Sequence, residues 1–412
     1  MFSISQDFAP PFKLIAPYFI IGAIFYFLST LAIFSFSVED LSFLNPSVIS
    51  FIHLFLLGFI MMTIFGAMAQ LVPVVLEVGH FGVELFYAIW PLLLIGTLLM
   101  VFGFLYSPAL LPYGGMVVLI SMMIFVGEIF LTMKKVKKLN IVMTSVLLSN
   151  TFLFMGIIVG LIMALGYSGT IDVDIHSLLR SHVYFVIAGY VSITLMGLSV
   201  VLIPMFGLSH GFSLKALEMA LYMMSFGVVS VFISSLSGDK SFEYVGYFLS
   251  IFALLTYFYQ VYKIYKTRAR KENDIYAISL MFAYISLVVA VLLGLSYLFF
   301  SYEPLLLASG WLLFFGFFGF AITGHIYKII PFLVWFERFS PFVGKKKVPM
   351  LADMLPKKSS NAQFVFSGVG VVLVALAILF QDTQMIHAGA SFLVVGAGAF
   401  VRSVFYMINF KE

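Results

Sequence analysis

The sequence contains no cysteine among its 412 residues. This absence excludes disulfides, thiolate metal sites, iron–sulfur clusters and a cysteine nucleophile. Any metal or cofactor must therefore be held by histidine, methionine, carboxylate or backbone groups. The seven histidines become the candidate ligands.

Charged residues are also scarce. They make up 10% of the chain, against about 25% in an ordinary soluble domain, whereas hydrophobic residues make up 63%. This composition excludes a soluble globular protein and indicates a polytopic membrane protein. The N-terminal residues lack a basic segment followed by a cleavage site, so we expect the first apolar run to be retained as a helix.

Long apolar runs are abundant, and each is long enough for the ~20 residues that cross a bilayer. Twelve can be drawn, at about 15–36, 49–72, 86–104, 113–133, 141–166, 182–206, 216–236, 245–265, 275–300, 306–334, 362–381 and 385–409. The sequence therefore predicts an all-α fold of twelve transmembrane helices, forming a single transmembrane domain over residues 1–412.

The charges in the connections are sorted by side. Basic clusters at 134–138, 263–274 and 345–347 fall on one face, whereas the opposite loops carry mainly Asp and Glu. The positive-inside rule makes the basic face cytoplasmic. We therefore predict a multi-pass protein of the inner (cytoplasmic) membrane, with both termini and the loop 337–361 in the cytoplasm. The basic clusters are interpreted as contacts to anionic lipids, and not to nucleic acid.

A spacing of small residues and proline, Gly-x7-Gly-x6-Pro, occurs three times. The copies are Gly58, Gly66 and Pro73; Gly189, Gly197 and Pro204; and Gly316, Gly324 and Pro331. Glycines eight apart lie near one helix face, where a neighbouring helix or a flat ligand can approach closely, and the proline ends or kinks the helix. The recurrence predicts three pseudo-symmetric repeats of four helices, at about 1–138, 139–272 and 273–412.

Two histidines occupy related places in this repeat. His53 lies five residues before the first glycine of its copy and His182 seven residues before. An imidazole inside an apolar helix usually faces the bundle interior for a purpose, so both are candidate metal or heme ligands. His176 and His387, near outer helix ends, are weaker metal candidates.

The remaining polar groups near helix ends are given no ligand role. His80 and His210 follow repeat prolines and are expected to be solvated loop residues. Glu128 and Lys328 are expected to extend toward the cytoplasmic surface. His325 lies one turn before Lys328 on the same helix face, which leaves open a proton or ion path from the cytoplasm.

Twelve helices in three groups of four, with histidines near outer helix ends, resemble subunit I of the heme-copper oxidases and their smaller relatives of the NnrS type. The latter are heme and copper membrane proteins linked to nitric oxide response. Their WHAHE…G…G…P helix is similar to IHLFLLGFIMMTIFGAMAQLVP here. The architectural resemblance covers the whole chain, and the motif covers only the repeated helices.

The sequence departs from the oxidases at the binuclear centre. Where the tenth helix of the family carries His-x-His, residues 308–311 read Ala-Ser-Gly-Trp, and the seventh helix has no histidine. A heme-copper centre of that type cannot be assembled from these residues. Oxygen reduction, and nitric oxide reduction at such a site, are not expected.

The resemblance implies one heme b rather than copper. Rotating the low-spin heme arrangement of the family by one repeat places His53 opposite His182 as two axial ligands. Arg180, just outside His182, would contact the propionates, since a guanidinium binds carboxylates in two-pronged fashion. Helix packing or room for the ring would be provided by Gly58, Gly66, Gly189 and Gly197.

The resulting expectation is a heme-binding membrane protein in electron transfer or small-gas response, with a redox partner or quinone and the lipid bilayer as surroundings. A transporter that binds a metal ion or small solute through the outer histidines is the alternative. A third reading is an assembly partner of a respiratory complex. The sequence leaves a homo-oligomer open.

Overall fold

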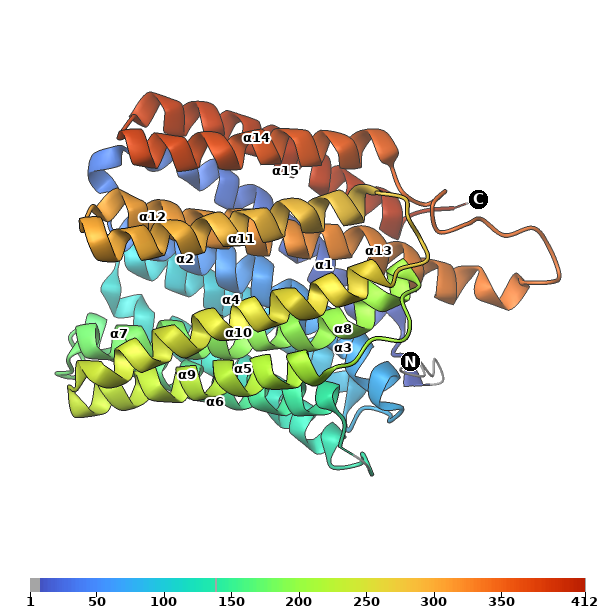
Figure 1. The fold of residues 1–412 in the computed structure, drawn as a ribbon, viewed down its shortest axis with the longest axis horizontal. Coiled ribbons are helices and arrows are strands. Elements are labelled where there is room, and N and C mark those ends of the chain that lie inside the picture. The colour runs from blue at the N-terminus through green and yellow to red at the C-terminus, as the bar shows by residue number, and fades with distance from the viewer. Residues whose placement is uncertain (1–7, 138, 412) are drawn as a thin grey trace. The chain divides into compact units, whose positions relative to one another are not determined.

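The computed structural model describes residues 8–137 and 139–411 (Figure 1). Over these residues, twelve helical spans are long and apolar enough to cross a membrane, and no strand is formed within them. Each predicted apolar run coincides with one span, so the twelve-helix prediction is confirmed. The chain is an all-helical, multi-pass membrane protein.

The principal helices follow one another along the chain with short connections. They are α1 (Phe12–Ala32), α2 (Pro46–Phe55), α3 (Met62–Leu76), α4 (Phe86–Leu105), α5 (Leu111–Met133), α6 (Ile141–Tyr167), α7 (Ile175–Val183), α8 (Ile193–Gly207), α9 (Lys215–Ser237), α10 (Lys240–Lys266), α11 (Ile275–Phe300), α12 (Glu303–Trp311), α13 (Gly319–Arg338), α14 (Lys357–Phe380) and α15 (Thr383–Ile408).

Asn and Asp side chains fix the start of several of these helices. An N-cap oxygen accepts a hydrogen bond from a first-turn backbone N–H that has no partner within the helix. The capping residues are Asn45, Asn140, Asp174, Asp239, Asp274 and Asp382. These polar caps set where a span can begin.

The three helices that carry the glycine–proline spacing are each interrupted by π-helix. The π segments are η4 (Leu56–Met61), η7 (Tyr184–Ser192) and η8 (Leu312–Phe318), and each contains the first glycine of its copy. They join α2 to α3, α7 to α8 and α12 to α13 into three continuous spans. A π segment inserts an extra residue into a turn and often marks a functional site.

In all three spans both glycines face the helix that precedes them in the chain. A Cβ at the first glycine would meet one side chain there, and a Cβ at the second would meet the side chain seven residues earlier. The contacts are Phe25 and Tyr18 for Gly58 and Gly66, Phe152 and Ser145 for Gly189 and Gly197, and Ser286 and Ser279 for Gly316 and Gly324. The glycines thus let two antiparallel helices approach closely.

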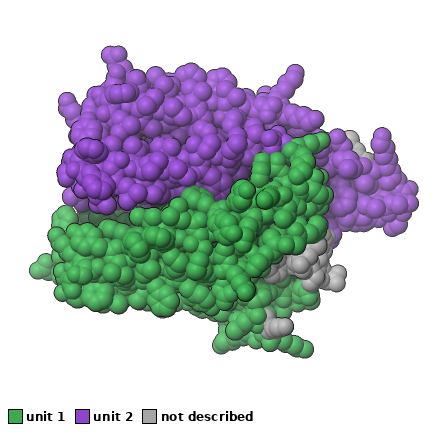
Figure 2. Space-filling view, viewed as in Figure 1, with its two compact units in different colours: residues 1–9, 69–272 green, residues 10–68, 273–412 purple. Residues whose placement is uncertain are grey.

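The chain forms two compact units, shown in different colours in Figure 2. One comprises residues 1–9 and 69–272, and the other residues 10–68 and 273–412. One boundary falls after Glu272, in the connection between α10 and α11. The other boundary falls inside α3, after Met68.

Helical hairpins dominate each unit. Within the first, α9 packs along α10 and α4 along α5; within the second, α14 packs along α15 and α15 along α1. Figure 1 shows the α9–α10 and α14–α15 pairs side by side. The core of the second unit is aromatic. The ring centroids of Phe55 and Phe315 are 4.2 Å apart, and those of Tyr26 and Phe59 are 4.8 Å apart.

The connection between α13 and α14 is shorter than the predicted loop 337–361, because α13 continues to Arg338 and α14 begins at Lys357. The connection is also tied to its own unit. Trp335 Nε1 donates a hydrogen bond of 2.8 Å to the Pro349 carbonyl, and Met354 is buried.

Candidate functional site

His53 lies on α2, three residues before the π segment η4. Its Nδ1 is 2.8 Å from the Ile49 carbonyl oxygen, one turn earlier on the same helix. A carbonyl oxygen can only accept, so Nδ1 carries the hydrogen and Nε2 holds the lone pair of the neutral imidazole. The helix thereby fixes the tautomer of His53 that coordinates through Nε2.

His182 lies on α7, two residues before the π segment η7, and has the same tautomer. Its Nδ1 is 3.0 Å from the Gly156 carbonyl oxygen of α6. A Cβ at Gly160 would lie 2.8 Å from His182 Cε1, so the ring occupies space that this glycine leaves open. Sequence reasoning missed both glycines, although their Gly-x3-Gly spacing is typical of a close helix contact.

His53 and His182 belong to different compact units. Each has its own backbone carbonyl partner within its unit. Their pairing across one iron stays a prediction from the repeat.

Arg180 is engaged with a carboxylate of the protein itself. Its Nη1 lies 3.4 Å from Glu243 Oε2 on α10, and Glu243 Oε1 accepts a 2.5 Å hydrogen bond from Tyr247. The Arg180 side chain is 42% exposed. The guanidinium therefore lies in a polar cluster two residues before His182, where a propionate would have to compete with Glu243.

The two weaker metal candidates have different surroundings. His176 is exposed in the first turn of α7, and its backbone N–H donates to Asp174 Oδ1 at 3.0 Å. His387 Nε2 is 3.1 Å from the Phe36 carbonyl oxygen, so Nε2 carries the hydrogen and only Nδ1 could coordinate. Across the described part of the chain, no three His, Asp or Glu side chains are grouped as a metal site requires.

The expectation for His80 and Glu128 is wrong. The side chains of the His80–Glu128 pair are 3% and 0% exposed, and His80 Nδ1 lies 2.8 Å from Glu128 Oε1. The residues are 48 apart in sequence, so neither local polarity nor helix period could reveal the contact. His210, by contrast, is exposed as predicted.

His325 and Lys328 each have a partner at the start of α11. Lys328 Nζ lies 2.5 Å from Asp274 Oδ2, and Asp274 also caps the helix through Ala277. His325 Nδ1 is 2.7 Å from the Ala321 carbonyl oxygen, and its Nε2 is 3.4 Å from the Tyr276 hydroxyl. Asp274 and Tyr276 thus hold the Lys328 and His325 side chains beside the N-terminal end of α11.

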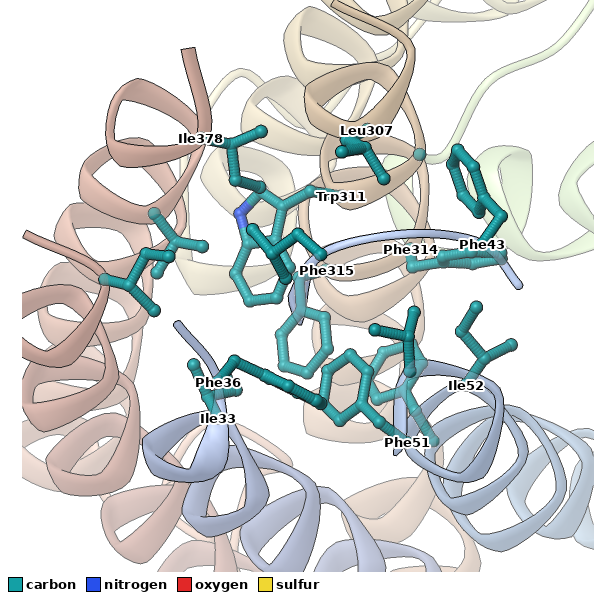
Figure 3. Close-up of a pocket in the computed structure, with 16 residues that line it drawn as sticks. Ile33, Phe36, Phe43, Phe51, Ile52, Leu307, Trp311, Phe314, Phe315 and Ile378 are labelled. Atoms are coloured by element: carbon teal, nitrogen blue, oxygen red, sulfur yellow. The ribbon is translucent and has the colours of Figure 1, made fainter. Parts of the chain in front are cut away.

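The second unit contains an apolar cavity of about 70 Å³, drawn in Figure 3. Trp311 and Phe315 stack with their centroids 4.4 Å apart at its wall. Its remaining lining side chains are aliphatic or aromatic, and Trp311 Nε1 is bound to the Val371 carbonyl. The cavity is far smaller than a porphyrin and offers no polar ligand group among its lining residues.

No family model matches this chain, and no curated protein matches it.

Proposed function

We propose that this chain is a heme-b-binding integral membrane protein that acts in electron transfer or in the response to a small gas such as nitric oxide, and that it does not reduce oxygen. The carrying observation is the shared tautomer of His53 and His182. Each donates Nδ1–H to a backbone carbonyl. Metal-ligating histidines characteristically donate their second ring N–H in this way, which orients the ring and raises the basicity of Nε2.

His53 and His182 would supply the two imidazole ligands of a six-coordinate heme. Two imidazoles bind iron without thiolate, which suits a chain that has no cysteine. When bound, the heme supplies one-electron chemistry. The protein's part is to orient the rings and exclude water, and buried Phe55 and Phe185 lie within three residues of the two histidines.

The proposed architecture is three four-helix repeats arranged as in subunit I of the heme-copper oxidases. Supporting it are the three π segments, each at the first glycine of its copy, and the recurring seven-residue spacing of the side chains that these glycines contact. The sorted charges support an inner-membrane location with both termini cytoplasmic.

The test is the absorption spectrum of the purified protein. We expect a Soret band and a low-spin spectrum that is lost in His53→Ala and in His182→Ala. His210→Ala is the matched control, because His210 is exposed and should leave the spectrum unchanged. Bound heme with an unchanged low-spin spectrum in either of the first two variants would exclude that histidine as a ligand.

A colourless preparation would overturn the heme proposal. Stoichiometric copper or zinc in it would favour the metal transporter, and neither colour nor metal would favour an assembly partner. A further variant tests whether the position of the His182 ring matters for the heme spectrum. Gly160→Ala should shift the spectrum while the protein stays folded, because the new methyl displaces the His182 ring and not a backbone segment.

A further inference from the structure

The buried carboxylate of Glu128 on α5 is surrounded by donors on one side only. Its Oε1 accepts from the Phe81 backbone N–H at 3.1 Å and from the Thr132 hydroxyl at 2.7 Å, and it faces His80 Nδ1 at 2.8 Å. Donors to a carboxylate favour its ionised form. Oε1 therefore carries stabilised negative charge inside the protein.

The second ring nitrogen of His80, Nε2, also forms a hydrogen bond, and a proline in the sequence explains its partner. Pro73 has no N–H, so the carbonyl of Ala69, four residues earlier in α3, lacks its usual helical donor. His80 Nε2 lies 2.7 Å from that carbonyl oxygen. Because a carbonyl can only accept, Nε2 carries a hydrogen.

These contacts fix the number of protons in the pair. With one hydrogen on Nε2, the 2.8 Å contact between Nδ1 and Oε1 requires a second hydrogen between them. The two further donors to Oε1 keep the carboxylate ionised and that hydrogen on Nδ1. The pair is then an imidazolium beside a carboxylate, with no net charge.

The second carboxylate oxygen, Oε2, is buried without a hydrogen-bond partner in the described part of the chain. An unpartnered buried oxygen of an ionised group is costly and calls for a ligand. The groups in contact with the His80–Glu128 pair are the Ala69 carbonyl on α3, Thr132 on α5 and the Phe86 ring on α4, whose centroid is 4.8 Å from that of His80. Exposed Lys135 lies nearby, with its Nζ 2.9 Å from the His80 carbonyl oxygen.

We propose that His80 and Glu128 form a proton-binding site in which Oε2 takes up a proton from the aqueous phase beside Lys135 and later releases it. Uptake forms one O–H bond, converts the carboxylate to a neutral acid and leaves the His80 imidazolium in place. The hydrogen bonds of His80 to Ala69 and to Oε1 persist in both states. The site can therefore change charge without repacking, and it does not depend on a bound heme.

Infrared difference spectroscopy on the full chain in lipid vesicles tests this proposal. Acidification should produce the C=O stretch of a protonated carboxyl group, which shifts with ¹³C-labelled glutamate and disappears in Glu128→Gln. Glu84→Gln is the matched control, because Glu84 is exposed on the connection to α4 and should leave this band intact.

A second variant keeps the test decisive if Glu128→Gln does not fold. Thr132→Val removes one donor to Oε1 and should move the C=O stretch of the protonated carboxyl group to higher frequency, because a carbonyl that accepts fewer hydrogen bonds is less polarised. A carboxyl band that is independent of pH, or a band frequency unchanged in Thr132→Val, would overturn the proposal.

Discussion

The substitution Gly189→Ala tests whether the repeated glycines serve helix packing. The added methyl would lie 2.6 Å from Phe152 Cβ and 2.8 Å from Phe152 Cγ of α6. Carbon atoms in good contact are about 3.5–4.0 Å apart, so α6 must move away from η7 by about 1 Å. Turning the Phe152 ring cannot relieve this clash, because Cβ is fixed to the backbone.

The expected cost is moderate. Overpacking by a methyl group destabilises by about 1–3 kcal/mol, and replacing glycine by alanine in a helix recovers about 0.5–1 kcal/mol. The net loss of up to about 2.5 kcal/mol lowers the unfolding midpoint by up to about 3 °C, because a chain of 412 residues has an unfolding entropy of about 0.9 kcal/mol/K. Thermal unfolding in detergent, followed by size-exclusion chromatography at one heating rate, measures it.

Gly127→Ala on α5 is the matched control, because nothing lies within 4 Å of a Cβ built there. It should leave the midpoint unchanged or raise it. An unchanged midpoint in Gly189→Ala, with heme lost, would refute the packing argument and make Gly189 a cofactor-contact residue.

Three further expectations concern the Arg180–Glu243 ion pair, the Asp174 cap of α7 and the sorting of the loop charges. Arg180→Ala should lower heme retention with little change in stability, since a half-exposed ion pair contributes at most about 1 kcal/mol. Glu243→Gln is the control, because it keeps the guanidinium. An equal loss of heme in that variant would assign the effect to the ion pair and not to a contact between Arg180 and the propionates. The hydrogen bond from the Ser177 N–H lowers the pKa of the Asp174 carboxyl. The stability that this cap gives to α7 is therefore complete above the ordinary Asp pKa of about 3.9, and it is lost as the pH falls through the lowered pKa. Circular dichroism should show that loss on acidification in the parent and not in Asp174→Asn. Single cysteines at Ser340 and Ser237, introduced into this cysteine-free chain, should react with an impermeant reagent from opposite sides, and labelling from the same side would contradict the topology.

The spans could be predicted from sequence because hydropathy is a local property. Twenty apolar residues must form a helix in a bilayer whatever their neighbours are, since every backbone group needs an internal partner there. The glycine–proline spacing was visible for the same reason. It did not show the face each glycine presents, and the contacts of Gly58 with Phe25 and of Gly189 with Phe152 appear only when the helices pack.

The candidate site was predicted in part. His53 and His182 were singled out by position, and the tertiary structure added the carbonyl partners that set their tautomers. The Ile49 partner lies one turn away and could have been anticipated. The contact of His182 with the Gly156 carbonyl on α6 could not have been anticipated, because the two residues are 26 apart in sequence.

By itself, the sequence determined that this is a twelve-span membrane protein without thiol chemistry, since composition and hydropathy act residue by residue. Only the tertiary structure decided that His80 and Glu128 are buried together. In sequence, His80 follows a helix that should end near Pro73, and Glu128 lies close to the end of another. The contact exists because Pro73 leaves the Ala69 carbonyl without a donor, the His80 ring supplies one, and its second nitrogen then meets a carboxylate 48 residues away.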